Sequence, residues 1–392
     1  MERSIMKYRI FPLIPRVRVN FRILDLLRSL FVLESQTWRR RKCEDLLSQY
    51  FDKEYTVLVG SGRSAIYNVL KSLPHKKVLI PAYTCMVVPE AATFAGKKIR
   101  YMHTSRESFN SDVLPQIDGD TIVIATHQFG FACDIVKIQK RCNDVGAILL
   151  EDCAAAMGTM VDGKKVGTFG DYAIVSFNST KLLNVPSKGG LIVVKRKDDF
   201  KRLKSCIVGK SSDLSFKTKH LFRGLIYCLT KNKWLYRCYH YLAIDRKGKL
   251  QRTEHEAIAA KMEDSYLYSF SEWQASILLP QIEKMKKIMG KRKRIFETLD
   301  KRVNNSLLKK PHWCSVEVCC RYPVLVKDRI AFYKACLQKG VDMDFSHSAL
   351  ACDLSFEEEH EMANEVLDLP FYYDMTDQEL DKVINVVNSI KL

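Results

Sequence analysis

Two residues that could hold an organic cofactor follow predicted β-strands. The apolar run 147–150 predicts a strand that delivers Glu151 and Asp152 at its carboxyl end. The run 172–177 predicts a second strand, and Lys181 stands just beyond its end. Because the carboxyl ends of parallel strands meet at one edge of a sheet, we expect the Asp152 carboxylate and the Lys181 amine to lie close together.

This pair of groups suits pyridoxal 5'-phosphate. The cofactor needs an amine to hold its aldehyde as a Schiff base, and a carboxylate to keep its pyridine nitrogen protonated so that the ring can accept electrons. The pattern predicts Lys181 for the first role and Asp152 for the second. Either residue alone is more often a solvated surface group, so the prediction depends on their occurring together.

A glycine turn at 60–66 offers a place for the phosphate. It follows the predicted strand 56–59 and opens a helix. A helix N-terminus presents free backbone N–H groups and the positive end of the helix dipole, which together favour an anion. Such a turn by itself is more often a plain connection, but its position one strand into the domain favours a phosphate site.

Several short motifs in register extend this pattern over residues 151–190. They are Glu151-Asp152 before small residues and Gly158, Gly163-Lys164, Gly167-Thr168-Phe169-Gly170-Asp171, Ser176-Phe177 before Thr180-Lys181, and Gly189-Gly190. In these motifs the chain resembles the sugar aminotransferases of the DegT/DnrJ/StrS class, which use pyridoxal phosphate and have fold type I. The resemblance covers roughly residues 30–200 and 262–392.

The resemblance implies an α/β fold and a set of cofactor contacts. The fold would have a large domain with a mainly parallel seven-stranded sheet flanked by helices, and a smaller C-terminal α/β domain. The cofactor residues that it implies are Gly62, Arg63, Ser64 and Ser176 at the phosphate, Cys85 and Ala155 at the ring faces, and Asp152 and Lys181. It also implies transfer of an amino group, from glutamate, to a nucleotide-linked keto sugar for glycan biosynthesis, by a homodimer.

The chain departs from the family pattern at four places. Cys85 stands where an aromatic residue usually stacks on the cofactor ring, and Ala155 where Gln or His commonly covers the other face. Leu267-Tyr268-Ser269 replaces the usual Asn-Tyr-Arg, whose Asn reaches the partner's phosphate. Arg63 replaces a small hydroxyl residue, and we expect its guanidinium to contact the phosphate directly.

Strands that alternate with helices between residues 56 and 194 predict an open sheet with helices on both faces. We expect an irregular basic arm at 1–45 with one helical stretch near 23–33, and the large cofactor-binding domain at 46–262. A connecting helix and the small domain would occupy 263–392. His127 also falls at a strand end, where it would either line the pocket or support the fold.

The composition is that of an ordinary soluble protein, but the formal net charge is +18. Thirteen cysteines without paired ligand spacing favour reduced thiols and no metal site.

We expect a cytoplasmic protein, because no cleavable signal and no apolar run of spanning length is present. No nucleic-acid-binding signature accompanies the basic blocks, so they favour a polyanionic substrate or an anionic membrane surface.

An insert at 196–252 is the part least like the family. Leu221, Phe222, Leu225 and Leu229 have helical spacing, with aromatic and basic residues interleaved around them. Such a helix would pack on its own domain or a second subunit, or would lie on the inner face of the membrane.

Two other functions remain open from the sequence. A pyridoxal-phosphate-dependent sugar dehydratase would use the same scaffold, but those relatives replace the Schiff-base Lys by His. A binding or regulatory protein on an aminotransferase scaffold would attach to a membrane or to nucleic acid through the basic blocks. The presence of both Asp152 and Lys181 favours the aminotransferase.

Overall fold

A central β-sheet organises the larger part of the molecule. The computed structural model describes residues 12–207, 209–211, 213–243, 258–312 and 319–392. Its largest sheet has seven strands among these residues, in the order β1-β9-β8-β5-β4-β2-β3. The strands are β1 (Tyr55–Val59), β2 (Lys77–Pro81), β3 (Lys98–Met102), β4 (Thr121–Thr126), β5 (Ile148–Asp152), β8 (Tyr172–Ser176) and β9 (Gly190–Val194).

In the described chain, β9 alone runs antiparallel to its neighbours in this sheet, β1 and β8. The remaining pairs are parallel. The predicted seven-stranded, mainly parallel sheet is therefore confirmed. Each predicted strand lies within one or two residues of its observed bounds.

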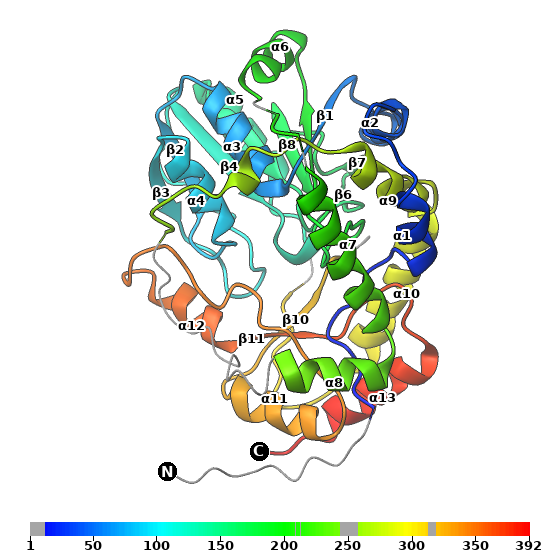
Figure 1. Cartoon of the computed structure of the whole chain (residues 1–392). Helices are drawn as coiled ribbons and strands as arrows, with labels where there is room; N and C mark the ends of the chain where they lie inside the picture. The colour runs from blue at the N-terminus through cyan, green and yellow to red at the C-terminus, as the bar shows by residue number, and fades with distance from the viewer. Residues whose placement is uncertain (1–11, 208, 212, 244–257, 313–318) are drawn as a thin grey trace.

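Helices cover both faces of the sheet, because successive strand residues point to opposite sides. On one face, Ile122 and Ile124 of β4 pack with α3 (Gly62–Ser72), α4 (Val87–Phe94) and α6 (Lys197–Cys206). On the other face, Val123 packs with α5 (Ile135–Val145), and β8 and β9 pack with α2 (Trp38–Phe51) and α9 (Glu272–Glu283). Figure 1 shows these layers in the upper half of the molecule.

A smaller unit follows, with its own core. Its strands β10 (Tyr322–Leu325) and β11 (Val366–Leu369) pair antiparallel. They pack with α10 (Met285–Arg302), α11 (Arg329–Gln338), α12 (Glu357–Glu365) and α13 (Asp377–Asn388), in the lower half of Figure 1. Thr376 and Glu379 exchange hydrogen bonds in a capping box at the start of α13.

The connection between the two units differs from the single long helix that we expected. The described residues form two helices there, α9 and α10, which meet at Lys284 with φ −99° and ψ 7°. Pro280 lies inside α9 and cannot donate a backbone hydrogen bond. The loss of that bond weakens the last turn of α9, and the chain changes direction four residues later.

The N-terminal segment carries more structure than an irregular arm. Leu13 and Ile14 lie in the core of the smaller unit, and α1 (Ile23–Ser29) and α2 pack against α9. Helix α2 begins at Trp38, inside the segment 1–45 that the sequence predicted as an arm. The basic residues within 1–11 lie outside the described residues.

After α6, the insert forms α7 (Leu214–Leu229) and α8 (Lys233–Ala243). Helix α7 packs on its own chain: Cys228 is buried, and the Cβ position of Gly224 lies 3.0 Å from Pro186 and 3.1 Å from Leu26. Helix α8 extends to the smaller unit, where Tyr236 Oη donates to Asp342 (2.5 Å). Residues 244–252 of the insert lie outside the described residues. In the part of the chain that is described, no helix is long and apolar enough to cross a membrane.

Candidate active site

Asp152 and Lys181 line the same cavity. Strand β5 ends at Asp152 and pairs in parallel with β8, with Asp152 opposite Ile174. The loop after β8 then returns Lys181 to the same sheet edge. The cavity has a volume of about 110 Å³, and Gly62, Arg63, Cys85 and Ser176 also line it. Six of the eight residues that the sequence predicted for the site therefore meet here.

The Asp152 carboxyl is buried, with 5% of its surface exposed. Burial raises its pKa, while the Ala154 N–H, which donates to Oδ1 (3.0 Å), and the nearby Lys181 charge act in the opposite direction. A carboxylate in this position is poorly solvated and is stabilised by a cationic N–H partner. A protonated pyridine nitrogen is such a partner.

Glu151, the neighbour of Asp152, points to the opposite side and supports the loop after β5. Its carboxylate accepts hydrogen bonds from the N–H groups of Gly167 (2.8 Å), Phe169 (2.7 Å) and Gly170 (2.6 Å). This contact explains why a glycine-rich run at 167–170 accompanies an acidic residue at 151.

His127 lies beside Glu151 and is fully buried, with its Nε2 3.2 Å from Oε2 of Glu151. The Cys133 N–H donates to Nδ1 (3.3 Å), so Nε2 carries the proton that faces Glu151. With Cys153, these two residues form a group of metal-ligand types. Because backbone N–H groups already occupy both Glu151 oxygens, His127 acts here as a structural support of the sheet edge.

The N-terminus of α3 forms the phosphate end of the cavity. The Ser61 side chain accepts from the Ser64 N–H (3.1 Å), while the N–H groups of Gly62 and Arg63 belong to the first turn, which has no intrahelical acceptors. Strand β9 approaches this turn closely: a Cβ at Gly190 would lie 2.5 Å from the Ser61 carbonyl oxygen. The Cβ position of Gly62 lies 3.0 Å from Ser176 Oγ, so a hydroxyl adjoins the turn.

This arrangement was compared with known proteins. The sequence pattern described as the DegT/DnrJ/EryC1/StrS aminotransferase family matches residues 25–388. The chain belongs to this family. The resemblance predicted from the motifs around Asp152 and Lys181 is therefore confirmed.

Individual relatives match over part of their length. The GDP-perosamine synthase of Vibrio cholerae is 31% identical over 157 residues, which are 38% of this chain and 42% of that protein. The UDP-N-acetyl-3-dehydro-alpha-D-glucosamine 3-aminotransferase of Acidithiobacillus ferrooxidans is 28% identical over 142 residues, which are 34% of this chain and 38% of that protein. The chain thus spans about two fifths of the length of these curated relatives.

A solved structure matches over nearly the whole chain. The sugar aminotransferase CalS13 from Micromonospora echinospora has a TM-score of 0.71 at 18% identity, covering 96% of this chain and 99% of that one. This likeness confirms the fold.

Two predicted cofactor residues lie elsewhere than expected for the family. In the described part of the chain, Ser64 and Ala155 are not among the residues that line the cavity. The Ser64 hydroxyl instead donates to the Tyr266 carbonyl (2.8 Å). Ala154 lines the cavity in place of Ala155, because the chain turns directly after β5. The spacing of residues after Asp152 in the sequence did not predict that turn.

Arg63 lines the cavity but already has an acidic partner. Its Nη1 lies 3.1 Å from Glu263, and its guanidinium lies 5.5 Å from the Tyr266 ring centre. The expected contact between Arg63 and the phosphate stays a prediction.

The segment in the place of the family's Asn-Tyr-Arg lies against its own subunit. The Gly60 N–H donates to the Tyr268 carbonyl (3.1 Å), and Ser269 forms a bridge with Val59 of β1. The apolar Leu267 at the expected Asn position offers no polar group to a partner's phosphate.

The sequence did not identify His347, a residue of the smaller unit whose ring the Lys181 charge influences. Burial, followed by the Arg321 and Lys181 charges, lowers the pKa of His347 to about 3. His347 has φ +48°, which is unusual for a residue other than glycine, and its ring packs edge-on against Tyr83. Long-range packing places His347 here, and no local sequence motif predicts its position.

The residues present fit pyridoxal phosphate. The cavity offers an amine, a carboxyl whose pKa is raised by burial, and a helix N-terminus beside a hydroxyl. These groups match the aldehyde, the ring nitrogen and the phosphate of the cofactor. Cys85 supplies a small side chain at the cavity wall.

Proposed function

We propose that the protein is a pyridoxal-phosphate-dependent aminotransferase that acts on a nucleotide-linked keto sugar. The observation that carries the proposal is the meeting of Lys181 and Asp152 in one cavity, at the carboxyl ends of β8 and β5 and beside the N-terminus of α3. Membership of the aminotransferase family supports it.

Each residue has a defined task. When bound, pyridoxal phosphate supplies an electron-accepting ring that stabilises negative charge on a neighbouring carbon. Lys181 would hold the cofactor covalently through its amine and would carry a proton to and from the substrate carbon. Asp152 would keep a proton on the ring nitrogen. The N–H groups of Gly62 and Arg63, with the Ser176 hydroxyl, hold the phosphate.

The substrate class comes from the relatives. One of the two relatives is named as a synthase of a GDP-linked sugar and the other as an aminotransferase of a UDP-linked sugar. We propose a keto sugar on a nucleoside diphosphate as amino acceptor, glutamate as donor, and a role in surface glycan biosynthesis.

A spectrum of the full-length protein with added pyridoxal phosphate tests the proposal. We expect a visible absorbance band that glutamate removes, and amination of a nucleotide keto sugar. Lys181→Ala should lose both the band and turnover, whereas Lys201→Ala, which changes an exposed lysine on α6, should keep both. A wild-type protein that stays colourless and binds anionic vesicles would instead support the binding protein considered from the sequence.

We also propose that the protein is a homodimer. Large apolar side chains are exposed on α1 and α7: Leu24 (46%), Leu27 (48%) and Phe222 (65%). Phe31, just beyond α1, is 84% exposed. Neighbouring exposed apolar groups of this kind favour a protein partner. Analytical ultracentrifugation at micromolar concentration should give the dimer mass, and a monomer would contradict the proposal.

A further inference from the structure

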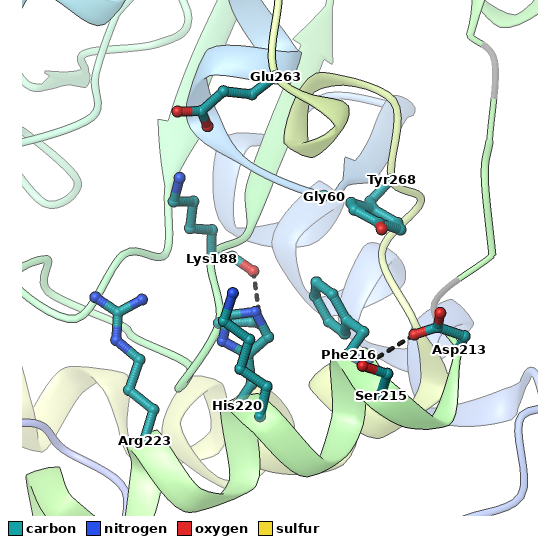
Figure 2. Close-up of a pocket in the computed structure, with 11 residues that line it drawn as sticks. Gly60, Lys188, Asp213, Ser215, Phe216, His220, Arg223, Glu263 and Tyr268 are labelled. Carbon is teal, nitrogen blue, oxygen red and sulfur yellow. Dashed lines mark hydrogen bonds between the residues drawn. The ribbon is translucent and has the colours of Figure 1, made fainter.

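A second cavity lies beside the candidate active site and is built by the insert. It has a volume of about 340 Å³. Helix α7 forms one wall, and the loop before β9 and the segment around Tyr268 form the others. Figure 2 shows Phe216, His220 and Arg223 rising from α7, with Lys188 and Glu263 facing them.

Cationic groups exceed carboxylates in this cavity. Lys188, Lys219 and Arg223 line it, against Asp213 and Glu263. Both carboxylates have other partners: Asp213 accepts from the Phe216 N–H (2.7 Å), and Glu263 pairs with Arg63 (3.1 Å). In the described chain, none of the three cations forms an ion pair with a carboxylate.

The positive charges act on one another. Burial, followed by the charges of Arg223, Lys219 and Lys188, lowers the pKa of His220 to about 4. Burial, followed by the Arg63 and Arg223 charges, lowers the pKa of Lys188. The cluster therefore keeps unbalanced positive charge at neutral pH, and an anion would relieve it.

Aromatic rings stand next to the cations. The rings of Phe216 and Tyr268 lie 5.0 Å apart, and those of Phe216 and His220 lie 4.4 Å apart. The ring planes are tilted by 57° between Phe216 and His220 and by 43° between Phe216 and Tyr268, so the cavity offers separate aromatic faces, and a nucleobase can stack on one of them.

The second cavity adjoins the first. Lys188 lines both, and Gly60 of the second cavity precedes Ser61 of the first. A ligand with an anionic and aromatic part in the second cavity can therefore extend its other end toward Lys181.

We propose that this insert-built cavity binds the nucleoside diphosphate of the sugar substrate. Lys188, Lys219 and Arg223 hold the diphosphate, and Phe216 and Tyr268 hold the base. The proposal rests on the proposed function for the sugar end of the ligand. Binding of a diphosphate by these three cations can be measured whether or not the protein aminates a sugar.

Calorimetry on the full-length protein without added cofactor tests the site, with UDP, GDP and inorganic diphosphate as probes. We expect Lys219→Ala/Arg223→Ala to raise the dissociation constants for both nucleotides at least about tenfold, because two charge-assisted contacts are lost. Lys201→Ala/Lys204→Ala removes two charges from α6 and should leave the constants within about twofold of wild type. Equal nucleotide affinity in the wild type and the pocket variant would overturn the proposal. Binding of inorganic diphosphate without binding of UDP or GDP would also overturn it.

A second measurement checks the same site in the wild-type protein, with one variant used only to assign the signal. In NMR titrations, UDP should raise the pKa of His220 from about 4, because the diphosphate offsets the neighbouring cations. His220→Asn assigns the signal. An unchanged His220 titration at saturating UDP would contradict the site. The visible cofactor band and its loss in Lys181→Ala report separately on the proposed function.

Discussion

At the scale of single residues, the Asp152 carboxyl is kept at a position that disfavours its charge. Burial raises its pKa, and the Ala154 N–H and Lys181 offset that effect only in part. Functional groups of this kind commonly lower the stability of the protein without its ligand.

We predict that Asp152→Asn stabilises the cofactor-free protein and weakens cofactor binding. A carboxyl whose pKa is raised on folding lowers stability above its folded pKa, and this cost disappears below its unfolded pKa of about 4. The variant should therefore melt roughly 1–3 °C higher at pH 7 and equal the wild type below about pH 4. Its affinity for pyridoxal phosphate should fall at least about tenfold.

The control is Asp198→Asn, which removes an exposed carboxylate and should change neither quantity. Thermal unfolding followed across pH gives both comparisons. A lower melting temperature for Asp152→Asn at pH 7 would show that the Asp152 charge is satisfied within the protein.

At the scale of elements, the close approach of β9 to the first turn of α3 shapes the phosphate end of the cavity. Gly190 permits it, because a side chain there would overlap Ser61 and the Gly62 nitrogen. We predict that Gly190→Ala displaces the turn, costs about 1–3 kcal/mol of stability, and lowers cofactor affinity at least about tenfold.

Gly290→Ala in α10 makes the same chemical change at a site where no heavy atom lies within 4 Å of the new Cβ. It should raise stability by about 0.5–1 kcal/mol and leave cofactor affinity unchanged. Urea unfolding and a cofactor titration measure both variants. If the two variants have the same stability and the same cofactor affinity, the close approach at Gly190 does not contribute to cofactor binding.

Local sequence predicted the strands and the residues at their ends, because alternating apolar runs and short motifs encode them. Asp152, Lys181 and the turn at Gly62 could be placed in this way. The direction of the Ser64 side chain and the pairing of Arg63 with Glu263 could not be predicted from local sequence. Both depend on the distant segment around Tyr266, which folds back beside α3. Residues of the smaller unit near Lys181, such as His347, depend on packing between distant segments.

At the scale of the whole molecule, Asp342 joins three parts of the chain. Arg16 of the N-terminal segment (2.7 Å), Tyr236 of α8 (2.5 Å) and Tyr333 of α11 (3.0 Å) all donate hydrogen bonds to its buried carboxylate. Charge alone suggested a free basic arm, but this partner, 326 residues away, fixes Arg16 in the fold.

We predict that Arg16→Ala destabilises the protein by about 3 kcal/mol, because it leaves a buried carboxylate without its cation. Arg16 and its neighbours hold the pKa of Asp342 well below the ordinary value, although burial acts in the opposite direction. The contribution of the pair is therefore fully present above about pH 4 and is lost as the pH falls through the lower folded pKa. Chemical unfolding of wild type and variant across this range measures it.

Tyr236→Phe removes a neutral donor from the same carboxylate and should cost about 1 kcal/mol. An Arg16→Ala variant as stable as Tyr236→Phe at pH 7 would mean that the N-terminal segment does not depend on this ion pair.

The attachment of pyridoxal phosphate to Lys181 can be measured most directly by borohydride reduction of the protein with the cofactor, followed by peptide mass spectrometry. Lys188 lines the same cavity and serves as an internal control. We predict that the reduced cofactor is found on Lys181, and that labelling of this cavity disappears in Lys181→Ala. Labelling of Lys188 in its place, or no labelling above that of exposed lysines, would contradict the proposed aminotransferase site.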